Sequence, residues 1–331
     1  AEKAGYKLYG DVEAGAPTQE KPGFTDQTES GKAQRRVRYC TIDNQNLCEI
    51  IWGDNRSEST YGVQIRSSVR QTKQIPYTQT NSTAPTLQMV ELFYTEHGLP
   101  IDKDKTYDYP NRYQIAYLPA NFDGNNYEDR PNDRSIKLHF NREPRFYASI
   151  LYNGCQWKGE TLYTYEGSVD GYGLGGGTTC TGYYMRKLFD PEISKSQMRR
   201  TDLTFYYMRY AEVLLIYAEA MAMQDKLTEA LEALNEVRDR VDLPAVSAST
   251  KTEFMKLLRH ERMVELAFEG HRFWDLRRWG LATTVLNGTH MEGVKPTKVG
   301  DGYEYNVVDC DAGKTRVYLE KYNRFPIPIA E

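Results

Sequence analysis

Residues 259–279 bring arginine, carboxylate and aromatic side chains close together along the chain. Glu261, Glu265 and Glu269 recur every four residues, so a helix would place them in one acidic stripe. Carboxylates with histidines nearby are groups that acid–base catalysis uses, and the stripe is therefore a candidate active site. The alternative is a lattice of buried or half-buried ion pairs that fixes how two helices cross.

Local spacing predicts which charges of this segment pair with one another. Residues three positions apart on a helix are neighbours on its surface. The rule gives these ion pairs: Arg262 with Glu265, Arg272 with Glu269, and Asp275 with Arg272 and Arg278. All of the predicted partners lie within the segment itself.

Two stretches begin like metal-binding motifs without completing them. His260 could open the HExxH motif of zinc proteases, but Val264 occupies the place of the second histidine. Asp102, Asp104 and Asp108 have the opening spacing of a calcium loop, which then lacks the required glycine and glutamate. Solvated loop carboxylates are the default interpretation of the three aspartates, and a partial calcium site is the alternative.

No other motif indicates a cofactor or a nucleophile. Residues 171–176 match GxGxxG, but a helix should follow such a loop and residues 178–182 are a poor helix start. The five cysteines form no CxxC pair, their odd number leaves at least one thiol unpaired, and no GxSxG elbow is present. We expect no cofactor and no enzymatic activity. Two carboxylates flanking a glycosidic bond are the alternative among the 46 acidic residues.

The loop that begins at Trp52 combines aromatic rings with planar polar groups. Sugar rings stack on aromatic faces, and planar polar groups bind their paired hydroxyls. Trp52 and Tyr61 are the candidate platforms, and three residues between them would supply the hydrogen bonds: Asp54, Asn55 and Arg56. The alternative is that Trp52 ends a buried strand and the other residues form a solvated turn.

A second aromatic loop runs from residue 152 to residue 172. Trp157, Tyr163 and Tyr165 lie in it among several glycines, where their rings could reach a ligand or a partner. A variable surface loop is the alternative. The chain holds 26 tyrosines against 11 phenylalanines, and tyrosine enrichment on a surface suits recognition.

The composition is that of an ordinary globular protein, with 40% hydrophobic and 27% charged residues. The net charge of −4 gives no support for a nucleic acid or an anionic membrane as partner. No apolar run approaches the roughly 20 residues that span a bilayer. Residues 1–6 lack the basic and apolar regions with which a signal peptide begins.

The elements that must position these residues change in character near residue 200. Before it, the pattern predicts only short pieces: strands over residues 48–52 and 146–152 and a helix over residues 86–95. After it, apolar residues recur with helical spacing over residues 210–221 and 227–241. Two amphipathic helices with so short a connection must pack as an antiparallel hairpin.

Further helices are predicted after this hairpin, whose second member resembles the second helix of a tetratricopeptide repeat. A third helix should begin at residues 250–252, where a hydroxyl can cap it, and should end at Gly270. A fourth helix should cover residues 271–280.

Three segments of the helical part look like the C-terminal half of a SusD/RagB-type protein: residues 208–220, 233–238 and 259–279. Other segments match the family in the same order: residues 85–91 its short PTQEMVD helix, residues 143–148 its DPRF strand entry, residues 181–187 its TGYYLRK segment, and residues 325–328 its closing PIP element. Ordered matches over so much of the chain are far more specific than any single motif.

The resemblance implies a mainly α fold with long loops and short β-strands on a tetratricopeptide-like helical scaffold. Residues 1–15 would be a remnant of the N-terminal helical repeat half. Residues 16–200 would be a loop-rich, ligand-facing region with short strands, and residues 201–331 the C-terminal helical region. Family members are normally longer and start with a lipidated cysteine that this chain lacks, so a C-terminal portion is expected.

The resemblance also implies a nutrient-binding protein of the outer membrane and cell surface that performs no catalysis. The expected ligand is an oligosaccharide, with a peptide as the alternative, and the expected partner is a SusC-like TonB-dependent transporter. A surface glycoside hydrolase on the same scaffold and a scaffold that binds only protein are the other candidates. In this family setting the charges are architectural, and four residues are expected to lock the last helices against the hairpin: Glu261, Glu265, Arg272 and Asp275.

Overall fold

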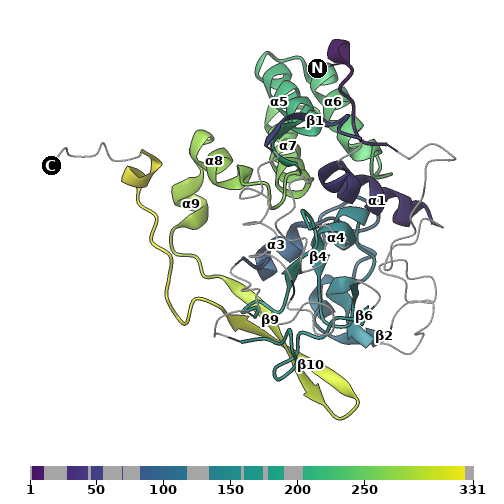
Figure 1. The fold of residues 1–331 in the computed structure, drawn as a ribbon. Coiled ribbons are helices and arrows are strands. Elements are labelled where there is room, and N and C mark those ends of the chain that lie inside the picture. The colour runs from purple at the N-terminus through teal and green to yellow at the C-terminus, as the bar shows by residue number, and fades with distance from the viewer. Residues whose placement is uncertain are drawn as a thin grey trace.

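The computed structural model describes residues 2–10, 28–43, 46–54, 69, 83–117, 134–157, 160–173, 178–189 and 204–324. Within these residues the protein is helix-rich, and its strands are short apart from one hairpin near the C-terminus (Figure 1). Helices α5, α6 and α7 lie at one end of the molecule, and the β9–β10 hairpin lies at the other. None of the described helices is both long and apolar enough to cross a membrane.

The first part of the chain folds into short elements joined by loops. Its helices are α1 (Glu29–Ile42), α3 (Leu87–Leu92) and α4 (Pro144–Ser149), with 3-10 turns η1 (Glu2–Ala4), η2 (Tyr109–Asn111) and η3 (Lys137–His139). Its strands are β1 (Ile50–Asp54), β2 (Ile115–Tyr117), β3 (Arg134–Ile136), β4 (Ile150–Leu151), β5 (Gln156–Trp157), β6 (Glu160–Thr161) and β7 (Tyr184–Met185). The predicted helix over residues 86–95 corresponds to α3, which Thr86 caps by accepting a hydrogen bond from the Met89 amide.

The strand expected over residues 146–152 is wrong for most of its length. Pro144 lies in the first turn of a helix, where a missing N–H costs nothing, and α4 continues to Ser149. Only Ile150 and Leu151 are extended, and they pair with β7. All residues of α4 are buried. A short buried helix and a buried strand show the same apolar run, so periodicity could not separate them.

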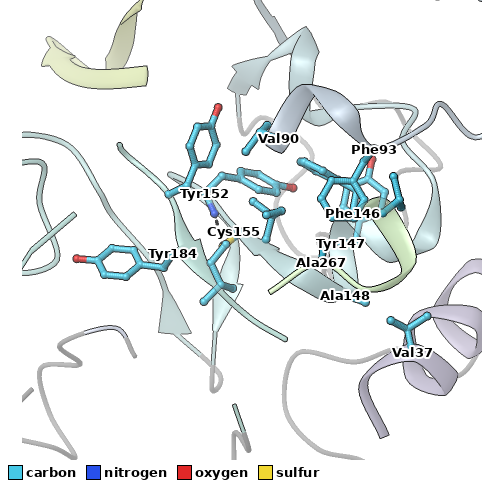
Figure 2. Packing of buried hydrophobic residues seen from close by; sticks show 14 of the residues in the cluster. Val37, Val90, Phe93, Phe146, Tyr147, Ala148, Tyr152, Cys155, Tyr184 and Ala267 are labelled. Carbon is cyan, nitrogen blue, oxygen red and sulfur yellow. Dashed lines mark hydrogen bonds between the residues drawn. The ribbon is translucent and has the colours of Figure 1, made fainter. Parts of the chain in front are cut away.

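The central core brings together residues from distant parts of the chain around a group of aromatic rings (Figure 2). Phe93 and Phe146 meet edge to face with ring centroids 5.9 Å apart, and Tyr152 stacks on Phe146 at 6.0 Å. Val37 of α1 and Val294 of the C-terminal hairpin belong to the same cluster. The core therefore depends on segments that the sequence separates by more than two hundred residues.

The second part of the chain begins with β8 and continues as helices. The elements are β8 (Phe205–Arg209), α5 (Tyr210–Met223), α6 (Leu227–Asp239), α7 (Lys251–Glu265), α8 (His271–Arg278) and α9 (Ala282–Leu286). Helices α5 and α6 pack on each other and both contact α7. Leu215 and Leu234 are fully buried in the cluster that they form. The predicted helical hairpin is confirmed.

Helix α7 begins as predicted but ends earlier. The Thr250 hydroxyl and the Glu253 side chain form a capping box at its start. Its last helical residue is Glu265, and a turn follows in which Phe268 has a φ of 68°. Gly270, with a φ of 85°, is the N-cap of α8. Gly270 therefore starts the next helix, because its left-handed backbone redirects the chain after the turn.

The described strands pair two by two in antiparallel order: β1 with β8, β2 with β3, β4 with β7, β5 with β6, and β9 (Glu292–Val299) with β10 (Gly302–Asp309). The turn η5 (Glu320–Asn323) follows the last pair.

The start of β9 lies against the segment before β7, where the Val294 amide donates to the Thr181 carbonyl at 2.8 Å. Gly182 has a φ of 78°, and a Cβ there would lie 1.9 Å from the Val294 carbonyl oxygen. Only glycine fits this approach.

Candidate ligand-binding site

The acidic stripe of the sequence is buried in an ionic lattice. The side chains of Glu261, Glu265 and Glu269 are each 1% exposed. Nη1 of Arg145, from α4, lies 2.5 Å from one oxygen of Glu261, and Nη1 of Arg238, from α6, lies 2.9 Å from the other. The stripe therefore ties α4 and α6 to α7.

In the described part of the chain, equal numbers of carboxylates and cations make up this lattice. Its members are Glu49, Glu143, Glu261, Glu265 and Glu269 with Arg145, Lys187, Arg209, Arg238 and Arg240. Glu265 accepts from Arg240, and its oxygens also lie 2.8 Å from Arg209 and 3.1 Å from Arg145. Because a buried charge is costly unless it is paired, a balanced lattice is the arrangement expected of a structural element.

The surrounding cations keep the carboxylates of the acidic stripe ionised. Burial by itself raises the pKa of Glu265, but the charges of Arg240, Arg209 and Arg145 outweigh burial and hold that pKa well below its usual value. Nearby cations lower the pKa of Glu261 in the same way. A general acid needs a raised pKa and contact with substrate, and the stripe has neither. Its charges are architectural.

Asp275 binds one predicted partner, Arg278, and one partner that was not predicted, Arg262. Arg262, expected to reach Glu265, instead makes hydrogen bonds of 3.0 and 3.1 Å to Asp275. The predicted pair between Asp275 and Arg278 is present at 2.8 Å. Arg278 continues to Glu219 of α5 at 2.6 Å. Helix α8 is thereby fastened to both α7 and α5.

The pair expected between Glu269 and Arg272 is wrong. Glu269 lies 2.5 Å from the Lys187 ammonium and 2.8 Å from the Arg209 guanidinium. Both partners are distant in sequence, and helical spacing cannot find them. Arg272 lines a cavity beside α8, where burial lowers the pKa of its guanidinium. Of the four residues expected to lock the helices, Arg272 is the one whose role differs.

Trp52 is exposed on the outer face of the β1–β8 pair. It is 64% exposed, and Tyr207 on β8 is 44% exposed. Their ring centroids lie 5.1 Å apart, and Phe205 adds a third ring 5.3 Å from Tyr207. The alternative in which Trp52 ends a buried strand is wrong. We name Trp52, Phe205 and Tyr207 the Trp52 platform.

The hydrogen-bonding partners predicted for Trp52 are only partly described. Asp54 ends β1 and is half-buried. The other predicted members of this loop lie outside the described residues: Asn55, Arg56 and Tyr61. The predicted site does not include Phe205 and Tyr207. Their alternation with the buried Tyr206 is the period of a half-buried strand and was the signal available.

Tyr163, Tyr165 and Tyr303 form a second aromatic surface, which we name the tyrosine cluster. Ring centroids lie 5.8 Å apart for Tyr163 and Tyr165 and 5.5 Å apart for Tyr165 and Tyr303. Tyr163 is 40% exposed, and the Lys298 ammonium lies 5.8 Å from the Tyr165 ring. Tyr303 comes from β10, far along the chain, and no sequence pattern connected it with the loop.

Contacts around the tyrosine cluster fasten its loop to the β9–β10 hairpin. The Ser168 hydroxyl donates to the Tyr163 carbonyl at 2.7 Å within the loop. Across to β9, the Lys295 ammonium lies 2.6 Å from the Glu166 carboxylate. The rings are therefore held between a tied loop and two strands, a preorganised arrangement that favours binding.

Trp157, by contrast, belongs to the core. It is 2% exposed and packs on Phe189 with ring centroids 5.3 Å apart. The guanidinium groups of Arg38 and Arg186 lie 5.8 and 5.9 Å from its ring. A ring enclosed in this way cannot stack on a sugar while the fold is intact, so the structure overturns its assignment as a ligand-binding residue.

A cavity of about 810 Å³ lies beside the turn that joins α7 to α8. Its walls are mostly apolar and include three flexible methionines, Met89, Met185 and Met263, together with Phe273 of α8. The volume falls within the range of roughly 300–1,000 Å³ found for ligand pockets. Sugar hydroxyls need polar partners, so such walls suit an apolar side chain better than a glycan.

The aspartates of the calcium-like loop are each occupied by the protein's own groups. Asp104 accepts hydrogen bonds from the hydroxyls of Thr95 and Thr106 at 2.7 and 2.6 Å. Burial alone raises the pKa of Asp104, but these hydrogen bonds lower it below its usual value. Asp102 and Asp108 pair with lysines instead. Among the described residues, no group of three or more His, Cys, Asp or Glu side chains is arranged to hold a metal ion.

Comparison with known proteins agrees with this helix-rich architecture. A family model described as the SusD family matches residues 48–331. The chain belongs to the SusD family. SusD-like protein P38 of Formosa agariphila is 36% identical over 94 residues, 26% of this chain and 19% of that protein. SusD-like protein P2 of the same organism is 33% identical over 103 residues, 28% of this chain and 20% of that protein.

Solved SusD-like structures share the fold over most of this chain. The SusD-like protein BF3747 of Bacteroides fragilis superposes with a TM-score of 0.66 at 22% identity, over 97% of this chain and 56% of its own. BF0978 of the same species, described as a SusD-like carbohydrate binding protein, gives 0.54 at 27% identity, over 74% and 46%. The chain thus spans about half the length of the solved relatives, on the tetratricopeptide-like helical fold of SusD proteins.

The SusD motifs lie in the core rather than on the aromatic surfaces. Residues 85–91 cover α3 except for its last residue, residues 143–148 cover most of α4, and residues 181–187 begin beside β9 and include β7. The closing motif at residues 325–328 lies outside the described residues. These three motifs therefore contribute to the packing of the protein, and the rings of the Trp52 platform and the tyrosine cluster lie outside them.

Proposed function

We propose that this SusD-family chain is part of a non-catalytic cell-surface protein that captures oligosaccharides and passes them to a TonB-dependent outer-membrane transporter. The observation that carries the proposal is the exposure of Trp52 beside Tyr207 on the outer face of a strand pair. Flat aromatic faces of this kind bind the apolar faces of sugar rings. The description of BF0978 as a carbohydrate binding protein supports the same ligand class.

The tyrosine cluster offers a second stacking surface for the same kind of ligand. Tyr163 and Tyr165 present neighbouring rings from one loop, and Tyr303 extends the surface onto β10. The loop-rich, ligand-facing region expected at residues 16–200 thus receives two rings from the C-terminal part in the Trp52 platform and one in the tyrosine cluster. We assign ligand contact to the Trp52 platform and the tyrosine cluster, and we keep Asp54, Asn55, Arg56 and Tyr61 as proposed hydrogen-bonding neighbours.

The position of the lattice carboxylates supports binding without cleavage. The lattice carboxylates are buried and paired with cations, whereas a glycoside hydrolase needs two carboxylates that flank the bond, one with a raised pKa. The protein would be held at the outer membrane by a lipid anchor and would contact a SusC-like transporter there. No cofactor takes part in this function.

A panel of neutral and acidic oligosaccharides tests the proposal. Each is titrated into the full chain by isothermal calorimetry, and the mixture is then analysed by chromatography for shorter products. Heat of binding with unchanged oligosaccharide is the expected result. New, shorter products would identify a hydrolase, and the absence of binding to every oligosaccharide, combined with capture of the transporter, would identify a scaffold that binds only protein.

A peptide is the second candidate ligand, because the cavity beside α8 is apolar. Its methionine-rich wall could receive an apolar side chain of a peptide. Titration with peptides that differ only in one leucine or alanine distinguishes the two ligands. A preference for the leucine peptide that is lost in a Met263→Gln variant would favour the peptide.

A further inference from the structure

Cys180 and Cys310 lie side by side although 130 residues separate them in the sequence. The Cys310 thiol lies 2.9 Å from the Cys180 carbonyl oxygen, to which it donates a hydrogen bond. Because the Cys310 sulfur already reaches the backbone of Cys180, a disulfide between the two residues would need little backbone movement.

The backbone holds both cysteines in place. The residue after Cys180 is Thr181, whose carbonyl accepts from the Val294 amide at 2.8 Å. At the other strand of the hairpin, the Cys310 amide donates to the Met291 carbonyl at 2.8 Å. A Cβ added at Gly293 would lie 2.5 Å from the Cα of Thr181. The segment at Cys180 and the open end of the hairpin are thus in direct backbone contact.

Both thiols are partly accessible, and Cys180 is the more reactive of the two because the pKa of Cys310 is raised. Cys180 and Cys310 are both half-buried, whereas Cys40 and Cys155 are buried. The neighbouring Cys310 side chain lowers the pKa of Cys180 to about 6, which favours the Cys180 thiolate. Burial raises the pKa of the Cys40 thiol to about 12. Of these cysteines, Cys180 is the one suited to attack an oxidant.

We propose that Cys180 and Cys310 are a disulfide-forming pair that closes when the protein enters an oxidising compartment. The oxidant is a low-molecular-weight disulfide such as glutathione disulfide, or the disulfide of an oxidoreductase. The Cys180 thiolate attacks one sulfur of that disulfide and expels a thiolate, which gives a mixed disulfide. The Cys310 thiol loses its proton and attacks the Cys180 sulfur, which expels the second thiolate. Two protein thiols are oxidised, and one disulfide is reduced to two thiols.

The bond would join the two elements that carry the tyrosine cluster. Cys180 follows the loop of Tyr163 and Tyr165, and Cys310 follows β10, the strand of Tyr303. Closing a loop of this length restricts the unfolded chain strongly. The disulfide therefore stabilises the docking of the hairpin and keeps the three rings together.

Thiol counting and peptide mapping test the proposal directly. The full chain is incubated with glutathione disulfide, denatured, and titrated for free thiols. The chain has five cysteines, and loss of the proposed pair leaves three titratable thiols. A non-reduced proteolytic digest should then contain a cross-linked pair of peptides with Cys180 and Cys310, lighter by two hydrogen atoms than the sum of the reduced peptides. Five free thiols after oxidation, or a bond between any other two cysteines, would overturn the proposal.

Melting experiments separate this bond from a general effect of oxidation. Oxidised wild-type protein should melt roughly 5 °C or more above the same protein treated with a reductant. The double variant Cys180→Ser, Cys310→Ser should show no such difference, and a Cys48→Ser variant should keep it. If the double variant does not fold, the single Cys310→Ser variant serves: it should form a mixed disulfide with glutathione at Cys180, and an unmodified Cys180 would count against the pair.

Discussion

Nη1 of Arg145 lies 2.5 Å from Oε1 of Glu261, although 116 residues separate the two positions. Both side chains are 1% exposed, so water does not screen the interaction. The pair connects α4, in the loop-rich part of the chain, to α7, in the helical part. The same carboxylate also accepts from Arg238 of α6, and Glu261 is therefore shared between three helices.

Replacing Glu261 by Gln should destabilise the protein by about 3–5 kcal/mol, because the buried charges of Arg145 and Arg238 would lose their partner. Urea unfolding followed by circular dichroism measures the change in the free energy of unfolding. Glu229→Gln, at an exposed position of α6, is the matched control and should change it by less than about 0.5 kcal/mol. Equal effects of the two substitutions would contradict a structural role for the lattice.

The lattice also predicts how stability depends on pH. In the folded protein the pKa values of Glu261, Glu265 and Glu269 are lowered. Their stabilising effect is present above the ordinary glutamate pKa of 4.5 and is lost as pH falls through the lower folded values. Burial raises the pKa of Glu143, which opposes this change and favours the folded state at low pH.

Because the lattice holds three carboxylates with lowered pKa values and one with a raised pKa, the melting temperature should fall as pH is reduced below about 4.5. Calorimetric scans at pH 7, 5, 4 and 3 and constant ionic strength measure it. The Glu261→Gln variant should start lower at pH 7 and fall less steeply. A melting temperature that stays constant down to pH 3 would show that the stripe does not carry this charge in the folded protein.

Replacing Trp52 by Ala should weaken oligosaccharide binding roughly tenfold, because it removes an exposed stacking face. The melting temperature should change little, since so much of the ring is already in solvent. Trp274→Ala is the matched control, an exposed tryptophan on α8 that belongs to neither aromatic surface. Calorimetric affinities that are equal for Trp52→Ala and wild type would remove the Trp52 platform from the ligand site.

Much of the helical part could be predicted from sequence, because the patterns that indicate its helices involve residues close together in the chain. The apolar periodicity of α5 and α6 and the capping box at Thr250 depend on residues within a few positions of each other. The ion pairs could not be predicted in this way. Helical spacing predicts an ion pair between Glu269 and Arg272. In the folded chain, Glu269 instead pairs with Lys187 and Arg209, which come from distant elements.

The exposure of the tryptophans in the candidate site could not be predicted from local sequence either. Trp52 ends one short strand-like piece and Trp157 follows another. The sequence predicts that both tryptophans stack on the ligand. The fold exposes Trp52 beside Tyr207 and encloses Trp157 against Phe189. Exposure of an aromatic ring depends on what packs against it, and in both cases that neighbour lies far along the chain.

Gly182→Ala should destabilise the protein by more than about 2 kcal/mol. The substitution combines a left-handed backbone with a collision against the Val294 carbonyl. Gly154→Ala separates the two causes, because Gly154 also has a positive φ but open space at the position of a Cβ. It should cost only about 1–2 kcal/mol. Urea unfolding of both variants checks the difference, and equal losses would mean that the close approach to β9 contributes nothing.

Because Val294 packs into the central core, that core cannot close during synthesis until Val294 has been added to the chain. The ribosome delivers Val294 more than one hundred residues after Gly182, the position that it covers. Until then, Tyr183 and the rings beside it lack the strand that closes over them, and the nascent chain exposes apolar surface. Contacts of such long sequence separation form slowly. Secretion of the chain while it is still unfolded would avoid this exposed intermediate in the cytoplasm.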